Sequence, residues 1–242
     1  MRSSLGRLVG CGLAFCSSII ACASATSPNS DGPDVAKVTY KEVIALYTAD
    51  CCVVILGATN SANRIQLLLQ PGICETTPGV KSYSGYVTLP ATDRQPYAQK
   101  IFFWFFEARN GSPQEAPLTI YTQGGPGAPS IGDALGLNGP CAVLEDSNTT
   151  VLNPLSWNNH VNVLYVDQPV QTGFSYDVAT PGVLDMITGE ITPGKLLGPA
   201  NYTVLEGVYG SQDPTRAPMT TAAAMEVLWE FTQAWMKTYV HT

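Results

Sequence analysis

Short runs of apolar residues, separated by turn-forming residues, divide the middle of the chain into strands. Ser82–Leu89 is rich in aromatic and β-branched residues, Gln99–Ala108 is almost wholly apolar, and Leu118–Thr122 and Val161–Asp167 follow the same pattern. Runs of this length bounded by Gly, Pro and Asn are typical of strands. Because a strand that is apolar on both faces needs cover on both faces, the pattern predicts a mostly parallel sheet in an α/β domain.

The helical signals are fewer and lie after the strands. A stripe of apolar side chains at three- and four-residue spacing predicts a helix from about Thr220 to Tyr239, and its members are Ala224, Leu228, Phe231, Trp235 and Tyr239. A second, short helix is predicted at Ile131–Leu137. The segment Thr180–Pro218 is rich in Gly, Pro, Thr and Asn, so we expect a long irregular excursion there.

The N-terminus has the pattern of a signal peptide. Arg2 and Arg7 precede an apolar run from Leu8 to Ala21, and small residues at 21–25 offer two Ala-x-Ala cleavage sites. The alternative is a membrane anchor, but the run is short for a bilayer span, which needs about 20 residues. We therefore expect a signal peptide at 1–23 and a mature protein that is soluble and secreted, or vacuolar, with no membrane association.

The region after the predicted signal peptide is less informative. Residues 24–73 are expected to be a linker and an N-terminal extension of unclear structure, beginning with a Ser/Pro/Asn/Gly-rich stretch at Ser24–Asp34. The apolar run Ala49–Gly57 has the composition of a buried strand but carries no motif.

Composition excludes some classes of function. The net charge is -7, only 13% of residues are charged, and no cluster of Lys and Arg is present. Because binding to phosphates requires such clusters, nucleic acid is excluded as a partner. No spacing of Cys and His resembles a zinc site, and we expect neither a metal nor a cofactor.

Cysteines and glycosylation motifs agree with passage through an oxidising compartment. Three of the seven cysteines fall in the predicted signal peptide, which leaves Cys51, Cys52, Cys74 and Cys141. An even number favours disulfides, whose pairing the sequence leaves open. Asn110, Asn148 and Asn201 each begin an Asn-x-Ser/Thr acceptor motif for N-glycosylation.

The candidate chemistry lies in the glycine-rich run Gln123-Gly-Gly-Pro-Gly127, between a predicted strand and a predicted helix. Glycines let a backbone approach a ligand closely, and such a loop can supply N–H groups to an oxyanion hole. On composition alone, a simple turn is favoured over such a site. A phosphate cradle is less favoured, because neither Gly-x-Gly-x-x-Gly nor a following Gly-Lys-Ser/Thr is present.

Further motifs, in this order along the chain, make the sequence resemble the serine carboxypeptidase family, and its fungal secreted members in particular. They are Cys74-Glu-Thr-Thr-Pro-Gly-Val-Lys-Ser-Tyr-Ser-Gly-Tyr86 with Phe103–Arg109, the Gly-Gly-Pro-Gly loop, Asn153-Pro-Leu-Ser-Trp157, and Asp167-Gln-Pro-Val with Gly173-Phe-Ser-Tyr176. The resemblance covers about Cys74 to Tyr239.

The resemblance implies an α/β-hydrolase fold and peptide substrates cleaved at the C-terminal bond through an acyl-enzyme. The fold would be incomplete: the N-terminal half of the sheet with antiparallel first strands, then parallel strands and helices. Gly125, with Gly124, would supply the oxyanion hole, and Gln123 would contact the terminal carboxylate of the substrate. Two departures concern that carboxylate site, because the family usually has Asn at position 123 and often Glu at position 137, where this chain has Leu137. Trp157, Asp167 and Gln168 also match the family pattern, although a Trp at such a position is more often core than site.

None of the catalytic triad is expected within these residues. No Gly-x-Ser-x-Gly occurs, and Gly173-Phe-Ser-Tyr176 lacks the closing glycine, so Ser175 is not expected to be the nucleophile. His160 and His241 have no setting in which they would act as the base. We expect residues 74–242 to be a partial domain that ends before the nucleophile strand and is inactive alone.

Other functions stay open at this level. A proline iminopeptidase-like hydrolase is disfavoured, because its loop begins with His and its Asp-Gln motif continues differently. A carboxypeptidase-like acyltransferase fragment and a non-catalytic secreted glycoprotein, or a truncated gene product, are the remaining alternatives.

Overall fold

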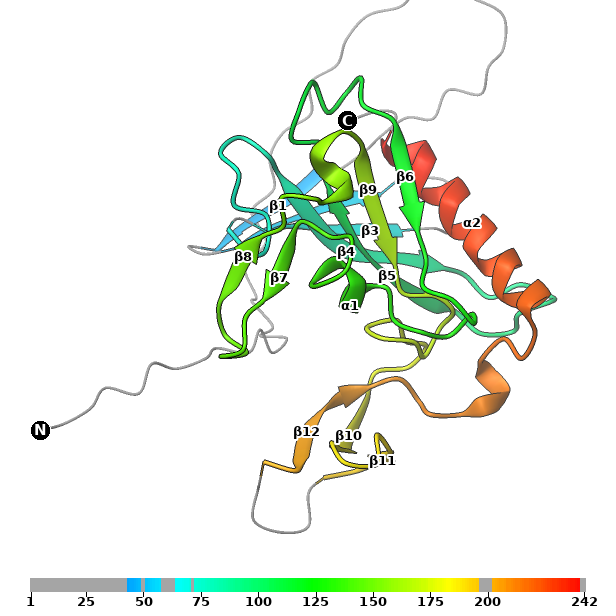
Figure 1. Ribbon diagram of the computed structural model, residues 1–242. Helices are drawn as coiled ribbons and strands as arrows, with labels where there is room; N and C mark the ends of the chain where they lie inside the picture. Colours follow the sequence, from blue (N-terminus) through cyan, green and yellow to red (C-terminus); the bar gives the residue numbers. More distant parts are fainter. Residues whose placement is uncertain (1–42, 49–50, 58–63, 71, 196–201, 240–242) are drawn as a thin grey trace, which may run out of the picture. The chain divides into compact units, whose positions relative to one another are not determined.

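The computed structural model describes residues 43–48, 51–57, 64–70, 72–195 and 202–239 (Figure 1). The side chains of residues 43–64, 66–68, 238 and 239 are not among those described. The predicted signal peptide, the linker at 24–34, Asn201 and His241 therefore lie outside the described residues, as do the side chains of Cys51 and Cys52.

A seven-stranded sheet forms the centre of the described chain. In spatial order its strands are β1 (Val43–Thr48), β2 (Cys51–Gly57), β3 (Arg64–Leu69), β4 (Ser82–Leu89), β5 (Gln99–Phe106), β9 (Asn162–Val166) and β6 (Leu118–Tyr121). The four strands expected from the sequence are all present. The three strands before them belong to the region whose structure the sequence left unclear, and they continue the sheet beyond β4.

The prediction of a mostly parallel sheet is wrong for the described residues, in which only β6 and β9 pair in parallel. β4 and β5 pair antiparallel over eight positions, and β5 pairs antiparallel with β9. The physical reason is the connection at 90–98, which holds no helix: an antiparallel pair needs only a turn, whereas a parallel pair needs a crossover. Apolar composition on both faces is common to buried strands of either direction.

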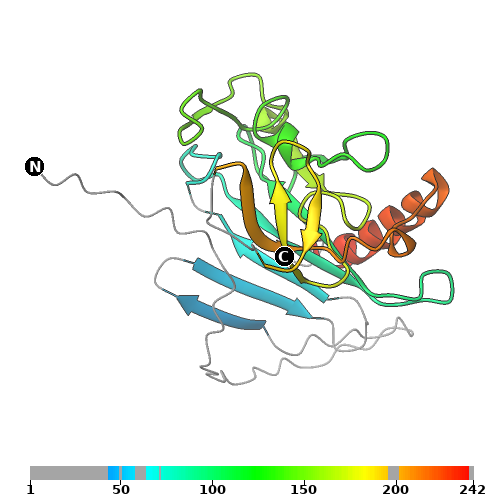
Figure 2. The same cartoon turned by 90° about the horizontal axis from the view of Figure 1, so that it is seen from below.

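Both faces of β5 are covered, as the sequence predicted. Phe103 and Phe105 point to one face, where they pack against Phe231 and Trp235 of α2 (Thr221–Tyr239). Figures 1 and 2 show α2 running along this sheet. Burying side chains of this size contributes about 1.5–3 kcal/mol each, which makes the α2 face a principal source of stability.

The opposite face carries shorter elements. Trp104 and Phe106 form a second apolar cluster with Tyr165 and with α1 (Ile131–Ala134). The helix is shorter than the predicted Ile131–Leu137, because the chain turns at 135–140 and brings Gly139 against Ala134, where a Cβ would lie 1.9 Å from the Ala134 carbonyl oxygen. The hairpin β7 (Cys141–Val143) and β8 (Thr150–Leu152) and the 3-10 helix η1 (Trp157–Asn159) follow.

The prediction of an irregular segment at Thr180–Pro218 is wrong. The segment forms an antiparallel sheet in the order β11 (Ile191–Pro193), β10 (Thr180–Asp185), β12 (Val204–Tyr209), followed by the 3-10 helix η2 (Pro214–Arg216). Figure 2 shows its strands in yellow and orange. Gly182 and Gly207 face each other across β10 and β12, and a Cβ at either would come within 3.1 Å of the Tyr209 side chain. These glycines make room for that tyrosine and do not break the strands.

Two further observations bear on the sequence predictions. Among the described residues, no helix combines the length and the apolar character that crossing a membrane requires. The same residues contain no group of three or more His, Cys, Asp and Glu side chains that could hold a metal ion.

Candidate functional site

The glycine loop begins directly after β6 and ends at α1. Gly125 has a φ of +143° and Gly127 a φ of +113°, values that favour glycine over residues with a Cβ. Both residues are exposed. Within the described part of the chain, the backbone N–H of Gly125 donates to no other group, whereas that of Gly124 donates to Oε1 of Gln123 at 2.7 Å. Of the two predicted oxyanion donors, only Gly125 is therefore available as the loop stands.

Ser130 holds the two ends of this loop together. Its hydroxyl accepts the backbone N–H of Gln123 at 2.9 Å and donates to the carbonyl oxygen of Val166 at 2.5 Å. The side chain is completely buried. The start of the loop is thus fixed to its end, and both are fixed to β9.

Asp167, the first residue after β9, supplies the next anchor. Its Oδ1 accepts the N–H groups of Ser130 and Ile131 at 2.7 and 3.2 Å, and its Oδ2 accepts that of Phe174 at 3.0 Å. Burial raises the pKa of this carboxyl above its ordinary value, although the three N–H groups act in the opposite direction. A Cβ at Gly173 would lie 2.1 Å from Oδ2, so only glycine leaves room for the carboxylate at that position. Asp167 therefore positions the loop and is not exposed to a substrate.

Gln123 makes contacts that the sequence did not predict. Its Nε2 donates to Oδ2 of Asp133 at 2.5 Å, and the same oxygen accepts the hydroxyl of Tyr121 at 2.8 Å. Burial raises the pKa of Tyr121, and the hydrogen bond to Asp133 acts in the same direction. Asp133 was missed because the motif marks Gln123 alone, and a lone Asp in a predicted short helix gives no signal.

Trp157 is not a core residue, in contrast to the expectation. Its side chain is 46% exposed and packs edge-to-face on Tyr121, with ring centroids 5.6 Å apart. Leu137 is 67% exposed. Both apolar side chains lie on the surface, and the Trp157 ring contacts Tyr121, the last residue of β6. Gln168 is buried, and its Oε1 has no hydrogen-bond partner among the described residues.

Ser175 has no free hydroxyl. Its Oγ donates to the carbonyl oxygen of Asp167 at 2.5 Å and accepts the N–H of Phe102 at 2.7 Å, and the residue is 2% exposed. His160 is exposed and lies between η1 and the start of β9, whereas Asp167 follows the end of β9. The hydroxyl of Ser175 is therefore used within the fold, and His160 lies on the surface.

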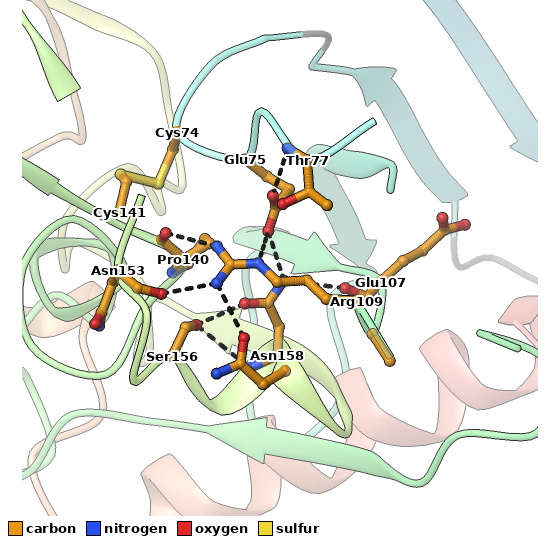
Figure 3. Close-up of polar contacts among 12 residues, drawn as sticks. Cys74, Glu75, Thr77, Glu107, Arg109, Pro140, Cys141, Asn153, Ser156 and Asn158 are labelled. Atoms are coloured by element: carbon orange, nitrogen blue, oxygen red, sulfur yellow. Dashed lines mark hydrogen bonds and ion pairs between the residues drawn. A yellow bond between two sulfur atoms is a disulfide. The ribbon is translucent and has the colours of Figure 1, made fainter. Parts of the chain in front are cut away.

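Arg109 forms a network that the sequence did not reveal (Figure 3). Its Nε pairs with Glu75 at 2.9 Å, and its terminal nitrogens donate to the carbonyl oxygens of Asn153 and Pro140, both at 2.7 Å. Burial raises the pKa of Glu75, but hydrogen bonds from Thr77, Asn158 and Arg109 lower it below its ordinary value. Arg109 thus joins three segments far apart in sequence.

The disulfide adjoins this network. Cys74 and Cys141 are bonded, which decides one pairing that the sequence left open, and both residues are buried. Cys74 precedes Glu75, and Cys141 follows Pro140, so the covalent link and the Arg109 contacts tie the same two segments together (Figure 3).

Comparison with known proteins decides the family. The model of the serine carboxypeptidase family matches residues 71–238. The chain belongs to the serine carboxypeptidase family. The matched range holds β4, β5, β6 and β9, the glycine loop, the Arg109 network and nearly all of α2. It confirms the resemblance recognised from the ordered motifs.

Relatives in this family are fungal carboxypeptidases. The chain is 47% identical over 179 residues to carboxypeptidase S1 homolog B of Arthroderma otae, covering 70% of this chain and 27% of that protein. It is 40% identical over 141 residues to carboxypeptidase S1 of Penicillium janthinellum, covering 58% of this chain and 29% of that protein. The chain spans little more than a quarter of the length of these carboxypeptidases.

A solved structure also matches. It is that of Kex1Δp, a prohormone-processing carboxypeptidase from Saccharomyces cerevisiae, with 34% sequence identity and a TM-score of 0.33, covering 39% of this chain and 20% of that one.

Proposed function

We propose that the described residues form the oxyanion and substrate-terminus side of a serine carboxypeptidase active site. The observation that carries the proposal is the unpartnered N–H of Gly125, held in a loop whose two ends are fixed by Ser130. When a peptide carbonyl becomes tetrahedral, its oxygen gains negative charge, and a donor already in place stabilises that charge without reorganisation. The anchors at Ser130 and Asp167 supply this preorganisation.

Gln123 is the proposed contact for the C-terminal end of the substrate. Its Nε2 carries two hydrogens, of which Asp133 accepts one, so the second remains for a substrate oxygen. Trp157 offers exposed apolar surface beside Tyr121 at the end of β6, which suits the side chains of a peptide.

We further infer that the fold is the N-terminal part of an α/β-hydrolase sheet, with residues 74–242 as its partial catalytic domain. The sequence contains no Gly-x-Ser-x-Gly, and the hydroxyl of Ser175 is used in the fold. These 242 residues by themselves are therefore proposed not to hydrolyse peptides.

The proposed route of the protein is secretion, or delivery to a vacuole, with removal of residues 1–23. Asn110 and Asn148 are both exposed, as glycan acceptors must be. The glycosylation of Asn201 is proposed from the sequence motif alone.

Two measurements on the purified 242-residue chain test the function. In the first, an N-acetyl dipeptide is titrated onto ¹⁵N-labelled protein, and the Gly125 amide and the Gln123 side-chain amide are expected to shift together. Shifts confined to other residues would refute the assigned site. In the second, a fluorophosphonate and a blocked dipeptide substrate are expected to give no labelling and no turnover, and either result would overturn the proposed inactivity.

A further inference from the structure

The chain contains the dipeptide Asn-Gly twice, and the fold surrounds the two copies differently. Asn110-Gly111 follows β5 in an exposed bend, whereas Asn138-Gly139 lies between α1 and β7. Asparagine is one of the thermolabile residues of proteins. It reacts most readily before glycine, which has no Cβ to obstruct its own backbone nitrogen. The surroundings of each pair therefore decide whether the pair reacts.

The reacting groups of Asn110-Gly111 are both free. The two residues are exposed, and within the described part of the chain the Asn110 side chain has no hydrogen-bond partner. The backbone N–H of Gly111 donates to no group there either, and nothing lies within 4 Å of the position that a Cβ of Gly111 would take. The N–H of Asn110 donates to the carbonyl oxygen of Asn159 at 3.1 Å, but these atoms take no part in the reaction. No hydrogen bond among the described residues therefore has to break before Asn110 reacts.

The reacting groups of Asn138-Gly139 are both held. Asn138 is buried, and its Oδ1 accepts the hydroxyl of Tyr165 at 3.1 Å. The N–H of Gly139 donates to the carbonyl oxygen of Asp133 at 3.3 Å. A ring between the Asn138 side chain and the Gly139 nitrogen could close only if both hydrogen bonds broke, and buried polar groups left unpaired are costly. The same dipeptide is thus protected at this place in the fold.

We propose that Asn110 is a site of spontaneous deamidation in the folded chain and that the fold protects Asn138 from the same reaction. The backbone nitrogen of Gly111 loses its proton to hydroxide and attacks Cγ of Asn110. The new N–Cγ bond closes a five-membered succinimide, and the Cγ–Nδ2 bond breaks as Nδ2 takes up a proton and leaves as ammonia. Water then opens the ring: addition at Cγ gives aspartate, and addition at the backbone carbonyl carbon of Asn110 gives isoaspartate. Water is the only reactant consumed besides the chain, and nothing is oxidised or reduced.

The nitrogen that leaves is also the predicted attachment point of a glycan, because Asn110-Gly111-Ser112 is an N-glycosylation motif. A glycan on Nδ2 replaces one of its hydrogens and makes it a bulkier leaving group, so a glycosylated Asn110 is expected to resist deamidation. A chain without the glycan gains a carboxylate directly after Arg109 instead. The protection by a glycan rests on the glycosylation proposed above, whereas deamidation of the unglycosylated chain does not.

Peptide mapping of the unglycosylated, folded 242-residue chain tests the proposal. The chain is incubated at pH 8, digested, and analysed by mass spectrometry with a fragmentation method that distinguishes aspartate from isoaspartate. We expect both products to accumulate at residue 110 while Asn138 stays intact. The rate should rise with pH, because the attacking nitrogen must lose its proton. In guanidinium chloride, where the fold is lost, the two asparagines should convert at similar rates.

Two variants of the same loop separate deamidation from glycosylation. Gly111→Ala keeps the glycosylation motif but places a Cβ beside the attacking nitrogen, and it should slow conversion of Asn110 by about tenfold, which is about 1.4 kcal/mol in the barrier. Ser112→Ala is the matched control, because it removes the motif, keeps the Asn-Gly pair and should leave the rate unchanged. Among secreted chains, the unaltered one should carry a glycan and no isoaspartate at residue 110, whereas Ser112→Ala should deamidate there.

The comparison of Asn110 with Asn138 needs no variant, so it stands even if circular dichroism shows that Gly111→Ala does not fold. An intact Asn110 in the folded chain, or conversion of Asn138 as fast as that of Asn110, overturns the deamidation proposal. A secreted chain with isoaspartate and no glycan at residue 110 contradicts the proposed glycosylation and supports the deamidation. None of these results depends on binding at the glycine loop.

Discussion

The buried carboxylate of Asp167 accepts the backbone N–H of Ser130 at 2.7 Å, across 37 residues of sequence. Because the Ser130 hydroxyl in turn accepts the N–H of Gln123, the end of a central strand fixes the start of the glycine loop. The position of the proposed oxyanion donor therefore depends on residues that do not contact the substrate.

Asp167→Asn is expected to destabilise the fold by about 2 kcal/mol, because the amide keeps one acceptor oxygen and turns a donor toward one of the buried N–H groups. Urea unfolding measures the loss. Asp146→Asn is the control: Asp146 also accepts two backbone N–H groups, those of Asn148 and Thr149, but in an exposed turn. Its effect should be much smaller, and equal losses at the two positions would contradict the buried role of Asp167.

Glu75→Gln is expected to cost about 3 kcal/mol, since it leaves the Arg109 charge buried without its partner. The side chains of this pair are only 9% and 0% exposed. The pair Arg94–Glu226 has the same length, 2.9 Å, but is 82% and 57% exposed. Glu226→Gln should therefore change the free energy of unfolding by less than about 1 kcal/mol.

The Glu75 contribution should also depend on pH. Because the folded state lowers the pKa of Glu75, its stabilisation is complete above the ordinary value of 4.5 and is lost as the pH falls through the lower folded pKa. The difference in unfolding free energy between the unaltered chain and Glu75→Gln should thus shrink on acidification. A difference that stays constant from pH 7 to pH 3 would argue against the lowered pKa.

Loss of the Cys74–Cys141 disulfide is expected to destabilise the chain by about 4 kcal/mol, the chain-entropy value for a loop of this length. The two residues are separated by 67 positions. Thermal unfolding of the double variant Cys74→Ser, Cys141→Ser tests this, and a Tm equal to that of the oxidised chain would count against the pairing.

Gly125→Ala is expected to weaken binding of the N-acetyl dipeptide, because its backbone has a φ of +143° that a residue with a Cβ rarely adopts. Gly111→Ala is the matched control, since Gly111 has a φ of +122° and open surroundings in another loop. Both variants should lose about 1 kcal/mol of stability, but only Gly125→Ala should change the Kd. A similar change in Gly111→Ala would indicate a general effect of loop strain.

Secretory expression is expected to add N-glycans at Asn110, Asn148 and Asn201. Asn110→Gln and Asn148→Gln should each lower the apparent mass on a gel by that of one glycan, because both side chains are exposed in the fold. Treatment with an N-glycosidase and mass spectrometry checks the assignment. A variant that carries as many glycans as the unaltered chain would refute glycosylation at the substituted residue.

Sequence periodicity predicted those helices and strands that depend on the local pattern of apolar residues. The stripe through Ala224, Phe231 and Trp235 gave α2 almost to the residue, because the helix packs this stripe on the sheet. The almost wholly apolar composition of β5 indicated a strand that is buried on both faces. It could not give the direction of pairing, which depends on the connections, nor the small sheet β10–β12, where glycines make room for Tyr209.

The candidate site was predictable only as far as the ordered motifs reach. They marked Gln123 and Gly125, whereas Asp133 and Arg109 act through partners that no spacing reveals. Arg109 binds backbone oxygens 31 and 44 residues away, and any residue type supplies such oxygens. The sequence motif that contains Arg109 therefore carried no sign of what the side chain contacts.

The hydrogen bond between Gln123 N–H and Ser130 Oγ closes residues 123–130 into a ring. A ring with fixed ends has little freedom in length, because an added or deleted residue must displace the backbone between the anchors. The loop at 145–149 is exposed throughout, and its hydrogen bonds stay within the β7–β8 hairpin and reach no strand of the central sheet. Along this chain, insertions and deletions should therefore be tolerated in the β7–β8 hairpin and rejected between Gln123 and Ser130, even where every side chain is kept.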